Sequence, residues 1–103
     1  CAVSGSGTTA GTLHVAGQAR KAGARICAVT AHPDSELAKA SDVVLFIPAA
    51  TKKRSEGEAA TVQPLGSLFD QGAHLCLDAV ALILSSERAK THGEVLSRHS
   101  NLE

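Results

Sequence analysis

Six consecutive residues near the start of the chain combine the features that a phosphate-binding loop needs. They form the sequence Ser-Gly-Ser-Gly-Thr-Thr at residues 4–9, between an apolar run and a segment with helical periodicity. Glycine lets a backbone approach an anion closely, hydroxyl groups are neutral donors, and a helix N-terminus presents unpaired N–H groups. Because ligands bind where parallel strands end, we predict that this Ser-Gly loop (residues 4–9) holds a phosphate. A plain strand-to-helix turn is the alternative.

The kind of phosphate compound follows from what the Ser-Gly loop lacks. A P-loop needs a lysine after its last glycine, but Gly7 is followed by threonine, and Gly5, Gly7 and Gly11 do not match the G-x-G-x-x-G dinucleotide fingerprint. No residue of the loop supplies a fixed positive charge. These features favour a small sugar phosphate and argue against a nucleotide cofactor.

Candidate acid–base residues lie on the longest predicted helix, at residues 67–88. Asp70, His74 and Asp78 are spaced four residues apart and therefore share one side of that helix. For His74 and Asp78 we favour a solvent-facing stripe or a local ion pair. For Asp70 two interpretations stay open: the same stripe, or a proton acceptor beside the Ser-Gly loop whose pKa burial would raise toward neutrality.

The remaining histidines and cysteines give weaker signals. His99 stands in the polar tail, where it is either simply exposed or able to reach a neighbouring subunit's site. The cysteines are odd in number, lie among apolar neighbours and form no C-x-x-C pair. This pattern predicts buried, reduced thiols in a cytoplasmic protein, and no metal site.

The elements around these residues alternate between strand and helix periods. Continuous apolar runs predict strands that are buried on both faces, and the segments between them predict right-handed helical crossovers. The architecture that follows is a three-layer α/β/α sandwich with a parallel sheet. The predicted strands are residues 1–4, 25–30 and 43–47, and the predicted helices are residues 9–22, 34–41 and 67–88, with a short helix and a polar tail in residues 91–103.

One long connection carries a cluster of charges. Residues 49–64, which we call the charged loop, contain the run Lys-Lys-Arg followed by two glutamates and show no periodicity. The loop is either a solvated connection or a lid that closes over a ligand. The long helix that follows is expected to pack in the core or at an oligomer interface.

Length and composition limit the function classes. The chain has 103 residues, 10 basic and 10 acidic residues, and 2% aromatic residues, which argues against nucleic-acid binding and allows one domain at most. The apolar run after Gly72 is broken by polar residues and is expected to fall short of a membrane span. Because the chain lacks methionine and begins inside a predicted strand, we interpret residues 1–103 as the carboxyl-terminal part of a single domain, incomplete at the amino terminus.

Four segments together resemble a known family. They are the Ser-Gly loop, the run Gln-Pro-Leu-Gly-Ser-Leu-Phe-Asp-Gln at residues 63–71, Leu-Asp-Ala-Val at 77–80, and Arg-His-Ser-Asn-Leu-Glu at 98–103. This combination resembles the 6-phospho-3-hexuloisomerases, which belong to the sugar isomerase (SIS) domain proteins and have a flavodoxin-like fold. The resemblance covers the whole chain.

The resemblance implies an activity and a site. It implies interconversion of D-arabino-hex-3-ulose 6-phosphate and D-fructose 6-phosphate, in the ribulose monophosphate route of formaldehyde fixation, by proton transfer through an enediolate and without a cofactor. Asp70 would be the proton acceptor, where the family commonly has glutamate, and His99 is a secondary candidate. The residues that would bind the substrate phosphate are Ser4, Gly5, Ser6, Gly7, Thr8 and Thr9. Thr8 stands where the family often has glutamate or arginine.

The resemblance also implies partners and leaves alternatives. The family is oligomeric and typically tetrameric, and association with 3-hexulose-6-phosphate synthase is expected from it. A related isomerase of arabinose 5-phosphate is one alternative activity. A non-catalytic SIS domain that senses sugar phosphates is another, and there the carboxylate of Asp70 would be unnecessary.

Overall fold

The computed structural model of the chain describes residues 1–54, 56–88 and 92–97. The chain divides into two compact units, Cys1–Ala73 (unit 1) and His74–Glu103 (unit 2). Unit 1 contains the strands, the first two helices and the start of the third helix, so everything that positions the Ser-Gly loop and Asp70 belongs to it.

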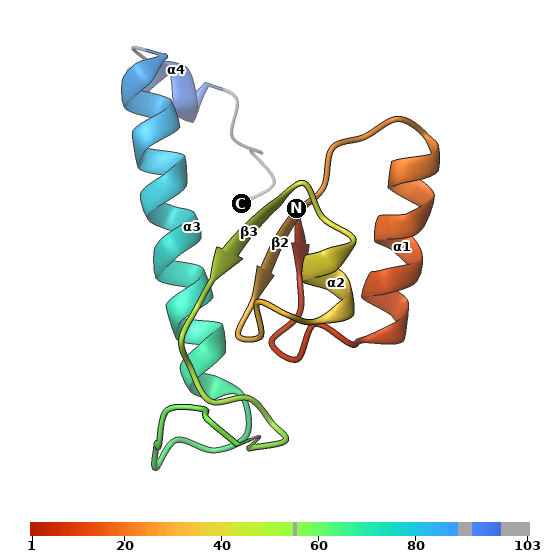
Figure 1. The fold of residues 1–103 in the computed structure, drawn as a ribbon. Helices are drawn as coiled ribbons and strands as arrows, with labels where there is room; N and C mark the ends of the chain where they lie inside the picture. Colours follow the sequence, from red (N-terminus) through yellow and green to blue (C-terminus); the bar gives the residue numbers. More distant parts are fainter. Residues whose placement is uncertain (55, 89–91, 98–103) are drawn as a thin grey trace. The chain divides into compact units, whose positions relative to one another are not determined.

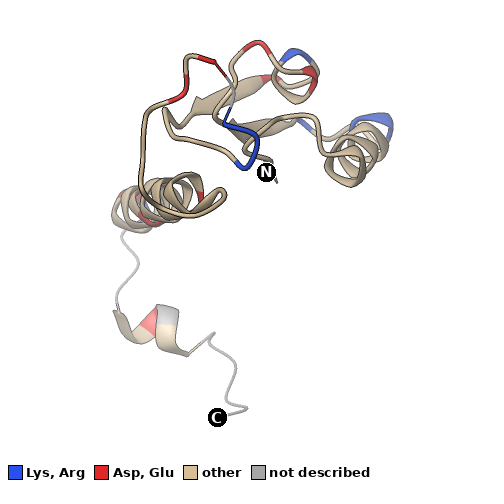
Figure 2. Ribbon diagram, turned by 90° about the horizontal axis from the view of Figure 1, so that it is seen from below, with Lys and Arg blue, Asp and Glu red and all other residues tan. Residues whose placement is uncertain are grey.

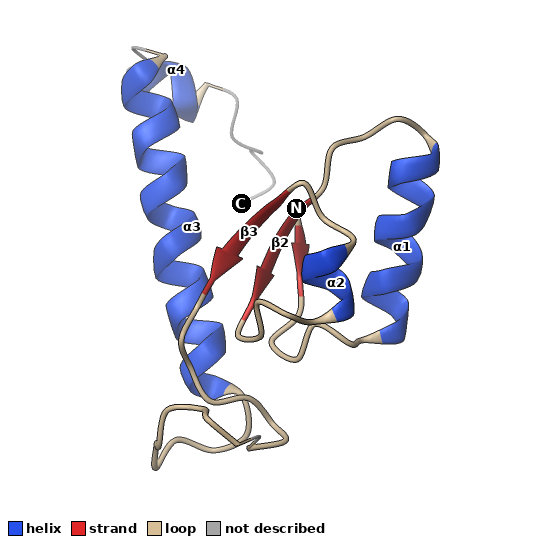
Figure 3. Cartoon of the chain, viewed as in Figure 1, coloured by secondary structure: helices blue, strands red, loops and turns tan. Residues whose placement is uncertain are grey.

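A parallel three-stranded sheet forms the centre of unit 1 (Figures 1 and 3). The strands β1 (Ala2–Val3), β2 (Cys27–Thr30) and β3 (Val43–Phe46) are ordered β1-β2-β3, and Ala2 pairs with Ala28 while Thr30 pairs with Phe46. All three strands were predicted from their apolar runs. Because the strands are parallel, the segments that follow them emerge at one edge of the sheet, where Figure 3 shows three neighbouring loops.

Two helices pack on this sheet. Helix α1 (Ala10–Lys21) and helix α2 (Glu36–Lys39) are the crossovers between successive strands. The buried residues Ala16 of α1, Leu37 of α2 and Ala28 of β2 belong to one apolar cluster. α1 matches its predicted extent and ends before Gly23, whose φ of +86° suits glycine. α2 is shorter than predicted.

The middle strand and its neighbour differ in burial. Ala28 and Val29 of β2 are fully buried although they point to opposite faces, as predicted. In β3, however, Val43 is 51% exposed and Phe46 is 47% exposed, so the prediction of a strand buried on both faces is wrong for β3. The reason is its place at the edge of the sheet order, where it has one neighbouring strand.

One carboxylate ties the amino ends of β2 and β3 to the carboxyl ends of α1 and α2. Asp42, just before β3, accepts hydrogen bonds from the backbone N–H of Ile26 at 2.7 Å and from the guanidinium of Arg20 at 2.9 Å. Arg20 also donates to the carbonyl of Ala40, which ends α2. The hydrogen bond from Ile26, supported by the charge of Arg20, holds the pKa of Asp42 below its ordinary value.

Helix α3 (Ser67–Glu87) begins in unit 1 and continues into unit 2, where α4 (His92–Leu96) follows. The expectation that the apolar run after Gly72 is too short for a membrane span is wrong. The run belongs to α3, which by length and composition alone could cross a membrane. A single such helix is weak evidence for a membrane span, since the core helix of a soluble protein passes the same test.

The cysteines are less buried than predicted, and the charged residues are spread over unit 1. Cys1, Cys27 and Cys76 are free, as predicted, but Cys1 is exposed and the other two are only partly buried, so the prediction of buried thiols is wrong. In unit 1, basic and acidic positions occur on several separate loops and helix ends rather than on one continuous basic face (Figure 2).

Candidate functional site

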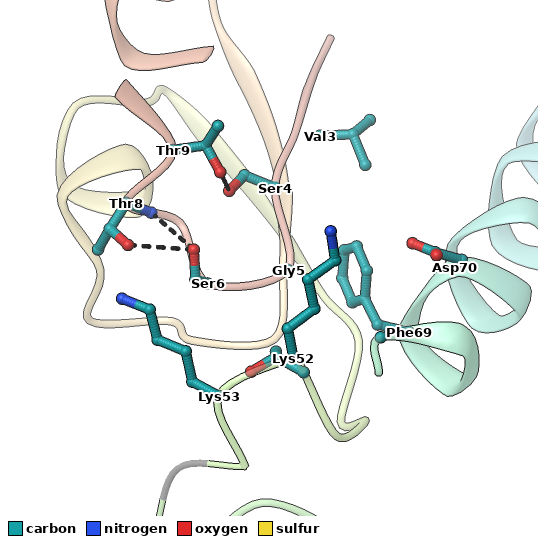
Figure 4. A pocket seen from close by; sticks show the side chains of 12 residues that line it. Val3, Ser4, Gly5, Ser6, Thr8, Thr9, Lys52, Lys53, Phe69 and Asp70 are labelled. Carbon is teal, nitrogen blue, oxygen red and sulfur yellow. Dashed lines mark hydrogen bonds between the residues drawn. The ribbon is translucent and has the colours of Figure 1, made fainter. Parts of the chain in front are cut away.

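A pocket of about 440 Å³ opens where β1 ends, and all of its lining residues belong to unit 1. This volume is in the range of small-molecule sites. Figure 4 shows the Ser-Gly loop on one side of the pocket and the first turn of α3 on the other. The lining residues are Val3, Ser4, Gly5, Ser6, Thr8, Thr9, Thr51, Lys52, Lys53, Gly66, Phe69 and Asp70.

The hydroxyl groups of the Ser-Gly loop are ordered by hydrogen bonds within the loop. The Ser4 hydroxyl accepts from the N–H of Gly7 at 3.1 Å and pairs with the Thr9 hydroxyl at 2.9 Å. The Ser6 hydroxyl oxygen accepts from both the N–H and the hydroxyl of Thr8, at 3.3 and 3.1 Å. Because this oxygen accepts twice, the Ser6 hydrogen is available to a ligand in the pocket.

Gly7 shapes the loop without lining the pocket. Its φ is +63°, and an added Cβ would lie 2.0 Å from the hydroxyl oxygen of Ser35. Its carbonyl accepts the backbone N–H of Leu37 at 3.0 Å, at the start of α2. Only glycine allows this approach, because any side chain would meet both the unfavourable φ and the Ser35 contact.

The N-terminus of α1 completes the anion-binding side. Thr9 is the N-cap of the helix and its side chain makes no capping hydrogen bond. The first amides of α1 therefore remain available to a ligand, and the helix dipole favours a negative charge there. Of the predicted phosphate-binding residues, the structure brings Ser4, Gly5, Ser6, Thr8 and Thr9 to the pocket wall.

Asp70 lines the same pocket from the first turn of α3. The ring of Phe69, which is 4% exposed, lies between Asp70 and the Ser-Gly loop (Figure 4). The Phe69 ring can pack there because residue 5 is glycine: an added Cβ would lie 3.2 Å from it. Asp70 itself is exposed.

Two lysines supply a positive charge that the Ser-Gly loop lacks. Lys52 and Lys53 of the charged loop both line the pocket. Figure 4 shows Lys53 directed toward Ser6 and Thr8, and Lys52 extending between the Ser-Gly loop and Asp70. The sequence signal was present in the Lys-Lys-Arg run, but nothing in it indicated where the loop folds.

The other predicted acid–base residues do not line this pocket. His74 Nε2 lies 3.6 Å from Asp78 Oδ2, one helical turn away, and the two side chains are 77% and 73% exposed, which confirms the solvent-facing interpretation. His99 lies outside the described residues. Among the described residues, no group of three or more His, Cys, Asp or Glu side chains could hold a metal ion.

The fold and the Ser-Gly loop define a class of protein. The SIS domain family matches residues 1–74, and the chain belongs to that family. The predicted α/β sandwich of SIS type is confirmed by a solved structure of a hypothetical protein, 31% identical, which aligns over 97% of this chain and 53% of its own with a TM-score of 0.82.

Within the family, two curated relatives carry the same functional name. A 3-hexulose-6-phosphate isomerase of Mycobacterium gastri is 45% identical over 97% of this chain and 50% of its own length. A 3-hexulose-6-phosphate isomerase of Bacillus subtilis is 36% identical over 97% of this chain and 54% of its own length. These relatives confirm the resemblance seen in the sequence, and the chain spans about half of their length.

Proposed function

We propose that the protein to which this chain belongs is an isomerase that interconverts D-arabino-hex-3-ulose 6-phosphate and D-fructose 6-phosphate. The observation that carries the proposal is the shared pocket: a hydroxyl- and amide-lined loop stands at one wall and the Asp70 carboxylate at another. The names of the two relatives support isomerisation of a 3-hexulose 6-phosphate. The ribulose monophosphate route of formaldehyde fixation is the corresponding pathway.

The proposed mechanism assigns one task to each side of the pocket. The Ser-Gly loop and the N-terminus of α1 bind the phosphate, which fixes the sugar carbons relative to Asp70. Asp70 removes the proton from C2 of the 3-ketose, giving an enediolate across C2 and C3. The hydroxyl proton on the C2 oxygen passes to the C3 oxygen, and Asp70 returns its proton to C3, so that the carbonyl is now at C2. Negative charge develops on the sugar oxygens, and the ammonium group of Lys52, which lines the same pocket, is proposed to offset it.

The first test is an assay of the whole protein with 3-hexulose 6-phosphate. Asp70→Asn removes the proton acceptor and keeps the side-chain shape, so we expect turnover to fall about 10²- to 10⁴-fold while phosphate affinity stays near that of the wild type. Formation of fructose 6-phosphate is the measurement. Asp78→Asn, on the same helix but exposed and outside the pocket, is the matched control and should keep full turnover.

The same assay separates the proposal from its alternatives. A sensor domain would bind the sugar phosphate without turnover in either variant. An arabinose 5-phosphate isomerase would convert that pentose and leave the hexulose unchanged. A wild-type protein that makes no fructose 6-phosphate would contradict the proposed activity.

We also propose, from the family resemblance, a homotetramer that can associate with 3-hexulose-6-phosphate synthase. Sedimentation of the whole protein, alone and with the synthase, tests both statements. A monomer that does not sediment with the synthase would contradict them.

A further inference from the structure

The charged loop contains a buried carboxylate that the mechanism does not use. The side chain of Glu58 is only 5% exposed, whereas glutamate side chains are usually exposed unless they are paired. Desolvating a carboxylate is costly, so its hydrogen-bond donors must be well placed. The position of those donors shows what this residue holds together.

Two donors come from one residue of the same loop. The N–H of Thr51 donates to Glu58 Oε2 at 2.7 Å, and the Thr51 hydroxyl donates to Oε1 at 2.6 Å. Thr51 is 4% exposed. Hydrogen bonds to an ionised acceptor are short and strong, and two of them to a single residue fix its backbone as well as its side chain. Thr51 directly precedes Lys52, so the carboxylate fixes the backbone from which the lysines extend.

The third donor belongs to the segment after β2. His32 Nε2 lies 2.9 Å from Glu58 Oε1 and donates when that nitrogen carries the proton. The backbone N–H of His32 donates to the Thr30 hydroxyl oxygen at 3.2 Å, and the Thr30 hydroxyl donates to the carbonyl of Gly5 at 3.1 Å. A continuous series of hydrogen bonds therefore joins the Ser-Gly loop to the charged loop.

We propose that Glu58 is a positioning residue for phosphate binding. Its carboxylate fixes Thr51 and so holds Lys52 and Lys53 at the pocket. A lysine on an anchored backbone loses less conformational entropy when it binds a phosphate than one on a free loop. The inference rests on the proposed phosphate site and goes beyond it, because it assigns a role to a residue that does not line the pocket.

The test is a double-mutant cycle in the whole protein, with the dissociation constant of inorganic phosphate measured by titration calorimetry. Glu58→Gln keeps the size of the side chain but turns an N–H donor toward groups that are themselves donors. We expect it to weaken phosphate binding about tenfold. In a Lys52→Ala/Lys53→Ala background the same substitution should have almost no further effect, because residues that act through one another are not additive.

Two further variants serve as a control for specificity and as a milder substitution in case Glu58→Gln destabilises the fold. Glu56→Gln changes an exposed glutamate of the same loop and should leave phosphate binding unchanged. If Glu58→Gln lowers the melting temperature strongly, Thr51→Val removes one hydroxyl donor with little change of shape and should weaken binding in the same direction.

Two results would overturn the inference. One is a Glu58→Gln protein, folded as judged by its melting temperature, that binds phosphate as the wild type does. The other is a Glu58→Gln substitution that weakens phosphate binding by the same factor in the wild type and in the Lys52→Ala/Lys53→Ala background. A wild-type protein that binds phosphate but does not isomerise the hexulose would contradict the proposed function alone and leave the role of Glu58 intact.

Discussion

At the scale of the residue, the site combines fixed donors with movable charges. The hydroxyls of Ser4 and Ser6 are oriented by neighbouring groups of the same loop, at 2.9 to 3.3 Å. Lys52 and Lys53 are exposed side chains with several rotatable bonds. Oriented donors select the geometry of a phosphate, and the lysines add attraction that depends on ionic strength.

Gly7→Ala tests the geometry of the Ser-Gly loop. The substitution places a Cβ 2.0 Å from the Ser35 hydroxyl oxygen, at a φ of +63°. The backbone strain alone costs about 1–2 kcal/mol, and the clash adds to it. We expect a lower melting temperature and loss of phosphate binding by calorimetry.

Gly17→Ala is the matched control for that substitution. Gly17 lies within α1, with no atom within 4 Å of an added Cβ. Helix propensity predicts a gain of about 0.5–1 kcal/mol in the free energy of unfolding there. Equal behaviour of the two variants would contradict the role assigned to Gly7.

At the scale of the element, the sequence predicted most of what positions the site. Each apolar run became a strand, and α1 was placed to within a residue, because these elements are set by local periodicity. The path of the charged loop could not be predicted. It depends on Glu58 meeting His32, 26 residues away in sequence, and the positions of the lysines follow from that contact. Asp70 was placed correctly at the start of α3, but its spacing left open whether it faces solvent or the Ser-Gly loop; it is exposed and also lines the pocket.

The hydrogen bonds of Asp42 predict how the stability of these elements depends on pH. Because the folded-state pKa of Asp42 is lowered, its stabilising effect is complete above the ordinary carboxylate pKa and is lost as the pH falls through the lowered value. Asp42→Asn should therefore lower the urea midpoint at pH 7, and the difference from the wild type should shrink as the pH falls through that range. Asp34→Asn is the control, since no hydrogen bond ties that exposed carboxylate to β2. A difference independent of pH would contradict the assignment.

At the scale of the whole molecule, unit 2 presents an apolar helix surface. Leu75 is 70% exposed and Leu82 is 73% exposed, and their spacing of two turns puts them on one side of α3. Exposed apolar surface of this kind marks an association site in soluble proteins. It agrees with the expected packing of the long helix at an oligomer interface, which remains a prediction.

Leu82→Glu tests whether this surface causes self-association. We expect the wild-type 103-residue chain to associate in sedimentation velocity experiments, and the variant to sediment as a smaller species, because a charge on the apolar side opposes burial. Ala81→Glu adds the same charge on another side of the helix and should change the sedimentation less. If both variants sediment as equally small species, net charge, and not this surface, controls association.

The sequential strand order has a consequence for synthesis. Every contact described for Gly5 and Gly7 with β2 and α2 lies within the first 37 residues. Lys52, Lys53 and Asp70 follow later in the chain. The loop proposed to bind the ester is thus translated before the residues proposed to add charge and to move protons. In the order of synthesis, the groups proposed for recognition precede those proposed for reaction.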